Sequence, residues 1–253
     1  MSEHCEKNTQ VLRLSVIIPA YNDAEMLERC LSALVEQTRL PDEVVVVDNG
    51  STDNTAAVAR SFGAVVIFEP VKGIPSATAA GFDAARSEIL GRLDADSIPS
   101  NDWCERVVDA FENNEHIAAI TGTADFYGGR KFTNWMGRNV YINGYLWSAE
   151  IALGHPPIFG SNCALSQSAW RRIRELVHRD IRTVHDDLDI SIQFEPDMEV
   201  LVDNDLRVSV SARPFQSARG LARRLWWVYT TVRVNWREES LIQRRRRHRN
   251  DKD

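Results

Sequence analysis

The first apolar run of the chain is Leu14-Ser15-Val16-Ile17-Ile18, which stops at the turn Pro19-Ala20-Tyr21-Asn22. A second run, Glu43-Val44-Val45-Val46-Val47, ends at Asp48-Asn49-Gly50-Ser51. Such nearly uninterrupted apolar runs are typical of strands buried on both faces of a parallel sheet. Between them, apolar residues recur at helical spacing over residues 24–37. Strand, helix and strand in this order predict the βαβ unit of a doubly wound sheet.

A third apolar run leads into the first of two acidic motifs. Ile89-Leu90-Gly91-Arg92-Leu93 is followed directly by Asp94-Ala95-Asp96. Two carboxylates at the end of a buried strand lie close enough to share one divalent cation, and Mg²⁺ or Mn²⁺ prefers oxygen ligands. Ligands of open α/β sheets bind at the carboxyl ends of the strands, so we expect all three strand ends to meet at one edge. A lone acidic triplet is also compatible with an ordinary turn.

The second acidic motif is His185-Asp186-Asp187-Leu188-Asp189, which leads into an apolar segment. On a helix, Asp186 and Asp189 share one face, whereas Asp187 points about a quarter-turn away. We expect like-charge repulsion from both neighbours to raise the pKa of Asp187 and to make it a better proton acceptor. The same acids would also stabilise the positive end of a helix dipole, which is compatible with catalysis.

Three motifs occur along the chain in a telling order: P-A-Y-N after the first strand, V-D-N-G-S-T-D after the second and L-D-A-D after a later one. Together they resemble the signature of family 2 glycosyltransferases, inverting enzymes with the GT-A fold. Gly160-Ser161-Asn162-Cys163-Ala164-Leu165 is similar to the G-G-N segment of that family. His185-Asp186-Asp187 resembles its E-D motif, with Asp186 in place of the usual Glu. The resemblance covers about residues 12–215 and implies a single α/β GT-A domain with a doubly wound, mostly parallel sheet flanked by helices.

The resemblance implies a binding site for a nucleotide-diphosphate sugar, with a UDP-sugar favoured and a GDP-sugar as the alternative. The donor-binding residues that it implies are Pro19, Ala20, Tyr21, Asn22, Asp23, Asp48, Lys72, Asp94 and Arg213. The Pro19-Ala20-Tyr21 turn would lie along the nucleobase, and Asp23 stands where the family usually has Glu. Asp48 is a candidate acceptor for an imino N–H of uracil or guanine, or else a cap for its own turn. Lys72 would lie near phosphate, or else is a surface lysine.

The resemblance also implies the metal ligands and the catalytic base. Asp96 would bind Mn²⁺ or Mg²⁺ directly, and Asp94 would lie near the ribose or reach the metal through water. His185 is a further candidate ligand, or else a hydrogen-bond partner of the acids. The metal neutralises the diphosphate leaving group. Asp187, with Asp186 as the alternative, would take the proton of the acceptor hydroxyl. Gly160, Ser161 and Asn162 would contact the acceptor or the donor sugar.

These features predict a metal-dependent inverting glycosyltransferase of the hexosyltransferase class, EC 2.4, acting in cell-envelope glycan or glycolipid synthesis. A non-catalytic sugar-nucleotide binding protein is one alternative. A nucleotidyltransferase is another, but it would carry a Gly-rich, Arg-containing loop where this chain has Pro19-Ala20-Tyr21-Asn22. The acceptor is a sugar or lipid-linked hydroxyl. Aromatic residues between Phe126 and Pro157 offer either a surface for that acceptor or part of the core.

Charge is unevenly distributed along the chain, whose net charge is −6. Residues 1–212 carry 18 basic and 32 acidic side chains, whereas residues 213–253 carry 12 basic and 4 acidic ones. We predict an amphipathic basic helix over residues 216–238 and an Arg-rich tail over residues 239–253. Such a helix suits an anionic membrane surface, or else packs on the domain before a solvated tail. No nucleic-acid partner is expected, because the main domain is acidic.

Length and composition indicate one soluble domain of 253 residues. We expect a polar tail over residues 1–11 and a GT-A domain over residues 12–215, with a nucleotide-binding half (12–122) and an acceptor half (123–215). The four cysteines, Cys5, Cys30, Cys104 and Cys163, form no C-x-x-C pair and fit a reducing cytoplasm. The sequence shows no signal peptide and no run of ~20 apolar residues. The expected location is the cytoplasm, peripherally at the inner face of the plasma membrane.

Overall fold

The computed structural model describes residues 11–128, 143–213 and 218–238 of the chain. Several sequence predictions therefore lie outside the described residues. They concern most of the polar N-terminal tail, Cys5, the aromatic residues Phe132, Trp135 and Tyr141, and the Arg-rich tail over residues 239–253.

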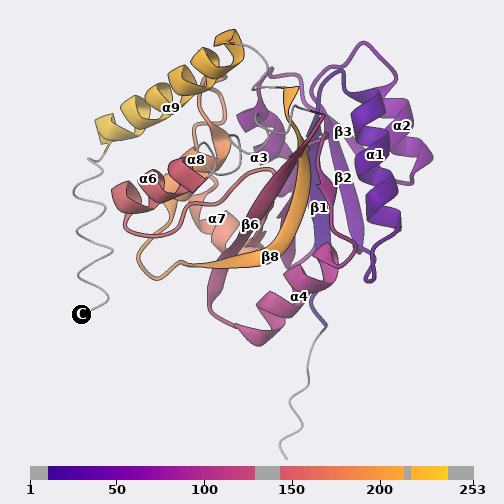
Figure 1. Cartoon of the computed structure of the whole chain (residues 1–253), viewed down its shortest axis with the longest axis horizontal. Helices are drawn as coiled ribbons and strands as arrows, with labels where there is room; N and C mark the ends of the chain where they lie inside the picture. The colour runs from indigo at the N-terminus through magenta and orange to yellow at the C-terminus, as the bar shows by residue number, and fades with distance from the viewer. Residues whose placement is uncertain (1–10, 129–142, 214–217, 239–253) are drawn as a thin grey trace, which may run out of the picture.

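An eight-stranded sheet runs through the centre of the described chain (Figure 1). Its strand order is β3-β2-β1-β4-β7-β6-β8-β5. The strands are β1 (Leu14–Ala20), β2 (Glu43–Asp48), β3 (Val65–Phe68), β4 (Ile89–Arg92), β5 (Ile98–Pro99), β6 (Ile117–Tyr127), β7 (Cys163–Ser166) and β8 (Glu199–Ser211). Neighbours in the half from β3 to β4 are parallel, as are β6 and β8, whereas β7 runs antiparallel to β4 and β6 and β5 antiparallel to β8. The predicted mostly parallel sheet is confirmed.

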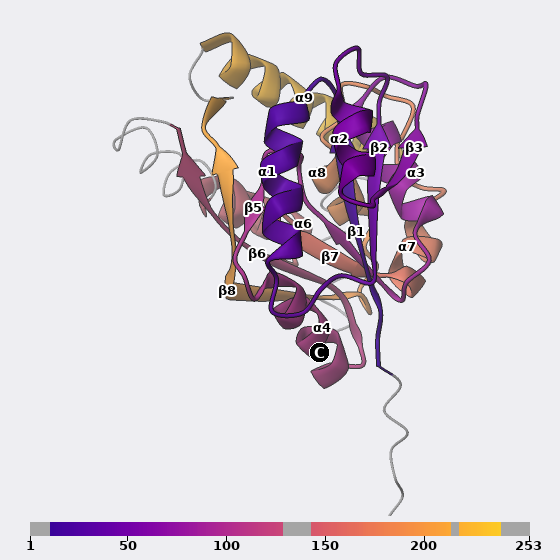
Figure 2. The same ribbon diagram turned by 90° about the vertical axis from the view of Figure 1, so that its right-hand side faces the viewer.

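Helices cover both faces of this sheet (Figures 1 and 2). They are α1 (Ala24–Val35), α2 (Thr55–Ser61), α3 (Ile74–Ala84), α4 (Trp103–Asn113), α6 (Asn143–Leu153), α7 (Gln167–Ile173), α8 (Asp186–Gln193) and α9 (Ala218–Glu238). Apolar residues of α1, α2 and α4 share one buried cluster, and those of α3, α7 and α8 share the other. Alternate residues of β1 point to opposite clusters, since Val16 and Ile18 belong to the first and Ile17 to the second.

Helix α3 approaches the sheet closely because a glycine lies at the contact. A Cβ added to Gly81 would lie 2.4 Å from Cγ2 of Ile17 and 2.9 Å from Cγ2 of Val47, so a larger residue would push the helix away. Thr78, one turn earlier, is brought to the buried boundary between α3 and α8. The tight packing therefore places one end of α3 beside the second acidic motif.

Helix α9 packs against α8 and α6 at the edge of the molecule (Figures 1 and 2). Val228 of α9 contacts a small buried cluster formed by Ala149, Leu153, Leu188 and Ile192. Among the described helices, none combines the length and the apolar character that crossing a lipid bilayer requires. A helix thus occupies most of residues 216–238. The expected division of the chain at residues 215 and 238 and the expected membrane role of this helix stay predictions.

Candidate active site

Both acidic motifs line one cavity at the carboxyl ends of β4, β6 and β8. The cavity has a volume of about 100 Å³ and is lined by Ile74, Arg92, Asp94, Asp96, Phe126, Phe159, Gly160, Ser161, Val184, His185, Asp186, Asp187, Val210, Arg224 and Trp227. A second cavity of about 390 Å³ is lined by Pro19, Ala20, Tyr21, Asp23, Asn49, Gly73, Ala77, Ala95 and Arg223, and it shares Ile74, Asp94, Asp96 and Arg224 with the first. The first two sequence motifs therefore lie next to the two acidic ones.

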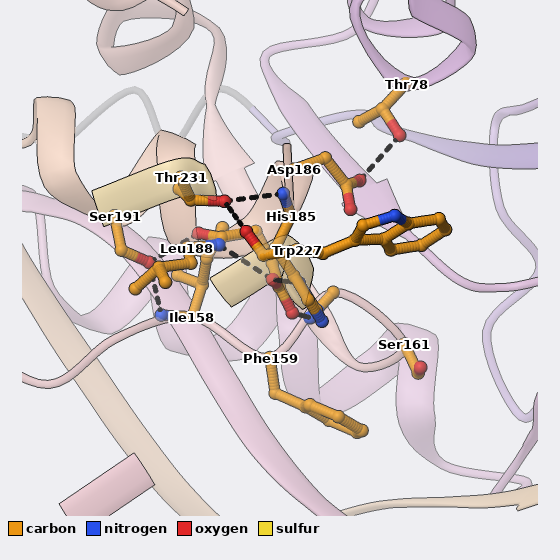
Figure 3. A network of polar contacts seen from close by, with 12 residues as sticks. Thr78, Ile158, Phe159, Ser161, His185, Asp186, Leu188, Ser191, Trp227 and Thr231 are labelled. Carbon is orange, nitrogen blue, oxygen red and sulfur yellow. Dashed lines mark hydrogen bonds and ion pairs between the residues drawn. The ribbon is translucent and has the colours of Figure 1, made fainter. Parts of the chain in front are cut away.

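A buried arginine connects the two acidic motifs. Arg92, the last residue of β4, is 3% exposed, and its Nη2 lies 2.9 Å from Oδ1 of Asp94 and 3.0 Å from Oδ2 of Asp186. The hydroxyl of Thr78 donates a 2.8 Å hydrogen bond to the same Asp186 oxygen, as Figure 3 shows. Removing one partner of such a buried ion pair would leave the other charge uncompensated. Arg92 therefore fixes the position of α8 relative to the D-x-D strand.

Asp187 faces a different set of partners from Asp186. Its Oδ2 accepts a 2.9 Å hydrogen bond from the backbone N–H of Gly160, and its Oδ1 lies 2.5 Å from Nδ1 of His185. Burial by itself would raise the pKa of Asp187, but the charge and hydrogen bond of His185 outweigh it and hold that pKa well below the ordinary value. The expected rise in the pKa of Asp187 is therefore wrong. The sequence argument counted the acidic neighbours and left out the imidazole.

Of Asp186 and Asp187, the carboxyl whose pKa is raised is that of Asp186. Burial raises the pKa of this carboxyl above its ordinary value, and the positive charge of Arg92 only partly offsets the effect. Burial also opposes protonation of His185, but the Asp187 carboxylate outweighs it and raises the pKa of the imidazole. His185 and Asp187 therefore form a paired acid and base, whereas Asp186 is held by Arg92 and Thr78.

Helix α9 supports the start of α8 from outside. The hydroxyl of Thr231 accepts a 2.7 Å hydrogen bond from the backbone N–H of His185 and donates one of 2.8 Å to the carbonyl of Trp227 (Figure 3). Farther along, Nδ2 of Asn235 donates a 2.7 Å hydrogen bond to Oδ1 of Asp189. Asp189 thus serves the packing of α8 and α9 rather than the cavity.

The D-x-D carboxylate Asp96 is more exposed to solvent than the carboxylates of Asp186 and Asp187. Oδ2 of Asp96 is 3.5 Å from Nη2 of Arg213, and that guanidinium also pairs with Oδ1 of Asp23 at 3.0 Å. Tyr127 donates a 2.9 Å hydrogen bond to the backbone carbonyl of Asp96. Burial, together with the negative charge of Asp94, raises the pKa of Asp96 to about 6. Negative charge at this position is incompletely balanced by the protein, which suits an incoming cation.

The three residues of the G-S-N segment have different roles: Gly160 and Ser161 line the cavity, whereas Asn162 lies in the core. A Cβ at Gly160 would lie 2.4 Å from Nη1 of Arg92, so only glycine fits there. Ser161 donates a short hydrogen bond to Asp94. Asn162 is completely buried: its Nδ2 donates to the carbonyls of Thr123 and Leu206, and its Oδ1 accepts from the indole of Trp103. Its side chain is turned away from the cavity, so we no longer assign it a direct contact with a sugar.

The N-terminal turns form the walls of the second cavity. Asp48 is 8% exposed, and its Oδ1 accepts a 2.8 Å hydrogen bond from the N–H of Ser51, which is the turn role that the sequence left open. Nζ of Lys72 lies 4.0 Å from the centroid of the Tyr21 ring and donates to the carbonyls of Asn49 and Gly50. Lys72 is therefore anchored beside the Tyr21 turn.

Within the described residues, the cluster of potential metal ligands is His185, Asp186 and Asp187, whose nearest ligand atoms lie within 4.8 Å of one another. Asp94 and Asp96 line the same cavity. Carboxylate oxygens and an imidazole nitrogen suit Mn²⁺, and the carboxylates suit Mg²⁺. The residues present therefore fit a divalent metal, with Asp96 as the carboxylate least engaged in salt bridges.

Sequence reasoning missed several residues that shape this site. The residues that contact or line it are Arg92, Thr78, Arg224, Trp227 and Thr231. Asn235 holds α8 from α9 through Asp189. One signal was present, because a charged residue inside the apolar run 89–93 must be paired when buried. The α9 residues carried no signal, since helical spacing says nothing about which element a helix covers.

Comparisons with known proteins agree with this geometry. The family model described as Glycosyl transferase family 2 matches residues 15–174, more than half of the chain. Glycosyltransferase AglE of Haloferax volcanii is 38% identical over 125 residues, which cover 46% of this chain and 38% of that protein. Chondroitin synthase of Pasteurella multocida is 31% identical over 139 residues, which cover 53% of this chain and 14% of the synthase. The chain thus spans well under half of the length of both relatives.

Solved structures show a similar fold. The mannosyltransferase PcManGT from Pyrobaculum calidifontis, in complex with GDP-Man and Mn²⁺, has a TM-score of 0.68 at 23% identity, over 90% of this chain and 65% of that one. TarS of S. aureus, residues 1–349 in complex with UDP, has a TM-score of 0.61 at 17% identity, over 87% of this chain and 65% of that one. At these identities the likeness concerns the fold, and it confirms the expected fold class.

Proposed function

The chain belongs to glycosyl transferase family 2, and from this premise we propose that it transfers a sugar from a nucleotide-diphosphate sugar to an acceptor hydroxyl with inversion at the anomeric carbon. The observation that carries the proposal is the shared cavity. The D-x-D motif and the α8 acids face each other there, and the cavity lined by Tyr21 and Asn49 adjoins it. Such an arrangement provides one end for a nucleotide diphosphate and the other for a proton acceptor.

The donor site extends from Pro19-Ala20-Tyr21 to Asp96. We assign the nucleobase to the Tyr21 and Asp48 side, where Asn22 is held by Thr52 through a 2.7 Å hydrogen bond. Arg213 and Lys72 are cations beside this path toward the diphosphate, and Arg223 and Arg224 line its cavity. A UDP-sugar remains our favoured donor and a GDP-sugar the alternative. Structures of similar fold are described with GDP-Man and with UDP, so both nucleotides are tested.

Asp96, with Asp94 and His185 nearby, would hold Mn²⁺ or Mg²⁺, and the positive charge of that ion would stabilise the departing diphosphate. The protein provides the remaining steps. The acceptor oxygen forms a bond to the anomeric carbon while the bond from that carbon to the diphosphate oxygen breaks. Asp187 takes the acceptor proton, because it lines the cavity, is ionised at neutral pH and has the imidazole of His185 against its Oδ1. Its lowered pKa makes it a weaker base than the sequence led us to expect. We place the reaction in cell-envelope glycan or glycolipid synthesis.

Calorimetry with a panel of UDP- and GDP-sugars, with and without Mn²⁺, tests the donor assignment. We expect metal-dependent binding of one nucleotide class together with slow donor hydrolysis. Asp96→Ala should lose the metal-dependent part, whereas Asp109→Ala, an exposed acid on α4, serves as the matched control. Metal-dependent binding without any hydrolysis or transfer would favour the non-catalytic binding protein. No binding of any nucleotide sugar would contradict the proposal.

A further inference from the structure

Helix α9 has an outer face that the described chain leaves uncovered. Leu225, Trp226, Tyr229 and Trp236 recur there at helical spacing and are 59%, 57%, 54% and 49% exposed. We call these four residues the outer stripe. The rings of Trp226 and Tyr229 lie 5.4 Å apart, centroid to centroid, so part of the stripe forms a continuous aromatic surface.

The outer stripe is not required to attach α9 to the domain. The opposite face makes that attachment through Val228, which packs on Leu188 and Ile192, and through the hydrogen bonds of Thr231 and Asn235 to α8. Large aromatic side chains on the free face therefore have no structural task in the described chain. Contiguous exposed apolar surface of this kind marks an interaction site.

Charge around the outer stripe identifies the kind of partner. Arg233 is exposed on the same helix, whereas Arg223 lines the second cavity. The sequence from residue 218 to residue 237 contains five arginines and no acidic residue. Helix α4 differs, because its exposed face carries Glu105, Asp109 and Glu112. Arginines beside tryptophan and tyrosine, without carboxylates, complement the headgroup layer of an anionic bilayer. A helix that lies in this layer need not span the bilayer.

We propose that α9 docks the protein onto an anionic lipid bilayer, with the outer stripe inserted among the headgroups and Arg233 facing the lipid phosphates. The surface is built on the described helix itself and does not depend on the tail over residues 239–253. Arg224 and Trp227 of α9 also line the cavity between the acidic motifs. The docked helix would thus form a wall between that cavity and the lipid surface. The role of this wall in catalysis rests on the proposed function, whereas the docking itself does not rest on it.

Vesicle flotation of the full chain tests the docking. Wild-type protein should float with vesicles of phosphatidylcholine and phosphatidylglycerol and much less with phosphatidylcholine alone. The variant Trp226→Ser/Tyr229→Ser/Trp236→Ser should reduce the bound fraction by roughly tenfold. Val35→Ser/Leu40→Ser/Leu176→Ser, three equally exposed apolar residues elsewhere, is the matched control and should float as wild type does. Arg233→Gln should weaken binding to anionic vesicles and reduce its salt dependence.

Other outcomes would overturn the proposal. A wild-type protein that never floats contradicts it, and so does a stripe variant that floats as wild type does. If the wild type is a dimer in solution, does not float, and becomes monomeric in the stripe variant, the outer stripe binds a second copy of the chain. Loss of flotation on removing residues 239–253 alone, with the stripe variant unaffected, would assign binding to the tail. Nucleotide-sugar binding, measured on the same samples without lipid, separates failure of docking from failure of the proposed function.

Discussion

The two acidic motifs meet in one cavity, but the protein treats their carboxylates differently. In the D-x-D motif, the side chains of Asp94 and Asp96 are 35% and 19% exposed. The ion pair between Asp96 and the long side chain of Arg213 has an N–O distance of 3.5 Å. In the α8 motif, Asp186 and Asp187 are 9% and 5% exposed and have partners at 3.0 Å or less. Asp96 is arranged to exchange its partner for a ligand, whereas the α8 acids are already satisfied by the protein, as is Asp94 through its 2.9 Å ion pair with Arg92. Residue type alone does not distinguish them.

The largest expected effect is on the α8 side. Asp187→Asn should keep donor binding and reduce transfer by about 10²–10⁴-fold, because an amide cannot accept the hydroxyl proton. The measurement is the transfer rate at saturating donor, with donor affinity from calorimetry as the control. A variant near the wild-type rate, with an inactive Asp186→Asn, would show that the base is the neighbouring residue.

A second substitution tests whether the α8 motif is held by protein partners. Arg92→Met leaves Asp94 and Asp186 without their shared cation in a buried place, so we expect the free energy of unfolding to fall by about 3–5 kcal/mol. Urea denaturation measures it. Arg92→Met/Asp186→Asn should recover part of the loss, because the uncompensated charge is gone.

The control for this experiment is Arg60→Met, an exposed arginine on α2, which should change stability by about 0.5 kcal/mol or less. If Arg92→Met is as stable as this control, the two motifs are positioned by packing rather than by the ion pair.

A third substitution addresses the D-x-D side. Asp96→Ala should keep the fold, since this carboxylate has no close ion pair to lose, and should weaken donor affinity in Mn²⁺ by about tenfold or more, at least ~1.4 kcal/mol. Titrations with and without metal check the result. An unchanged metal effect would move the metal to the cluster of His185, Asp186 and Asp187.

The smallest effect is expected at Ser161, whose hydroxyl donates to Asp94 at the boundary between the motifs. Ser161→Ala should weaken donor binding by about 1 kcal/mol, because water can replace the hydroxyl at a partly exposed carboxylate. Ser61→Ala, on the exposed end of α2, is the control. A large loss of stability in Ser161→Ala would mean that Asp94 belongs with the buried, structural carboxylates.

Much of the fold was predictable because the apolar runs at β1, β2 and β4 are local signals, and each ends in a polar turn. The partners of the carboxylates could not be predicted, because they come from distant segments of the chain. Arg92 reaches Asp186 across the boundary between the sheet and α8, and Asn235 reaches Asp189 from α9. Asn162 sits in a motif associated with sugar contact, but its orientation depends on Trp103 and the β6 and β8 carbonyls. The error over the pKa of Asp187 had the same origin, since the direction of a side chain decided it.

The position of β7 has a consequence for synthesis on the ribosome. Cys163–Ser166 is the strand that joins the two halves of the sheet, between β4 and β6. As the chain emerges, β3, β2, β1 and β4 can pair first, but the free edge of β4 has no partner until β7 has been made. An unpaired strand edge is a template for aggregation. A nascent chain that stalls before residue 163 would therefore expose this edge together with the D-x-D motif, whose partner motif at residues 185–189 has not yet been made. Chaperone binding in that interval would protect the growing chain.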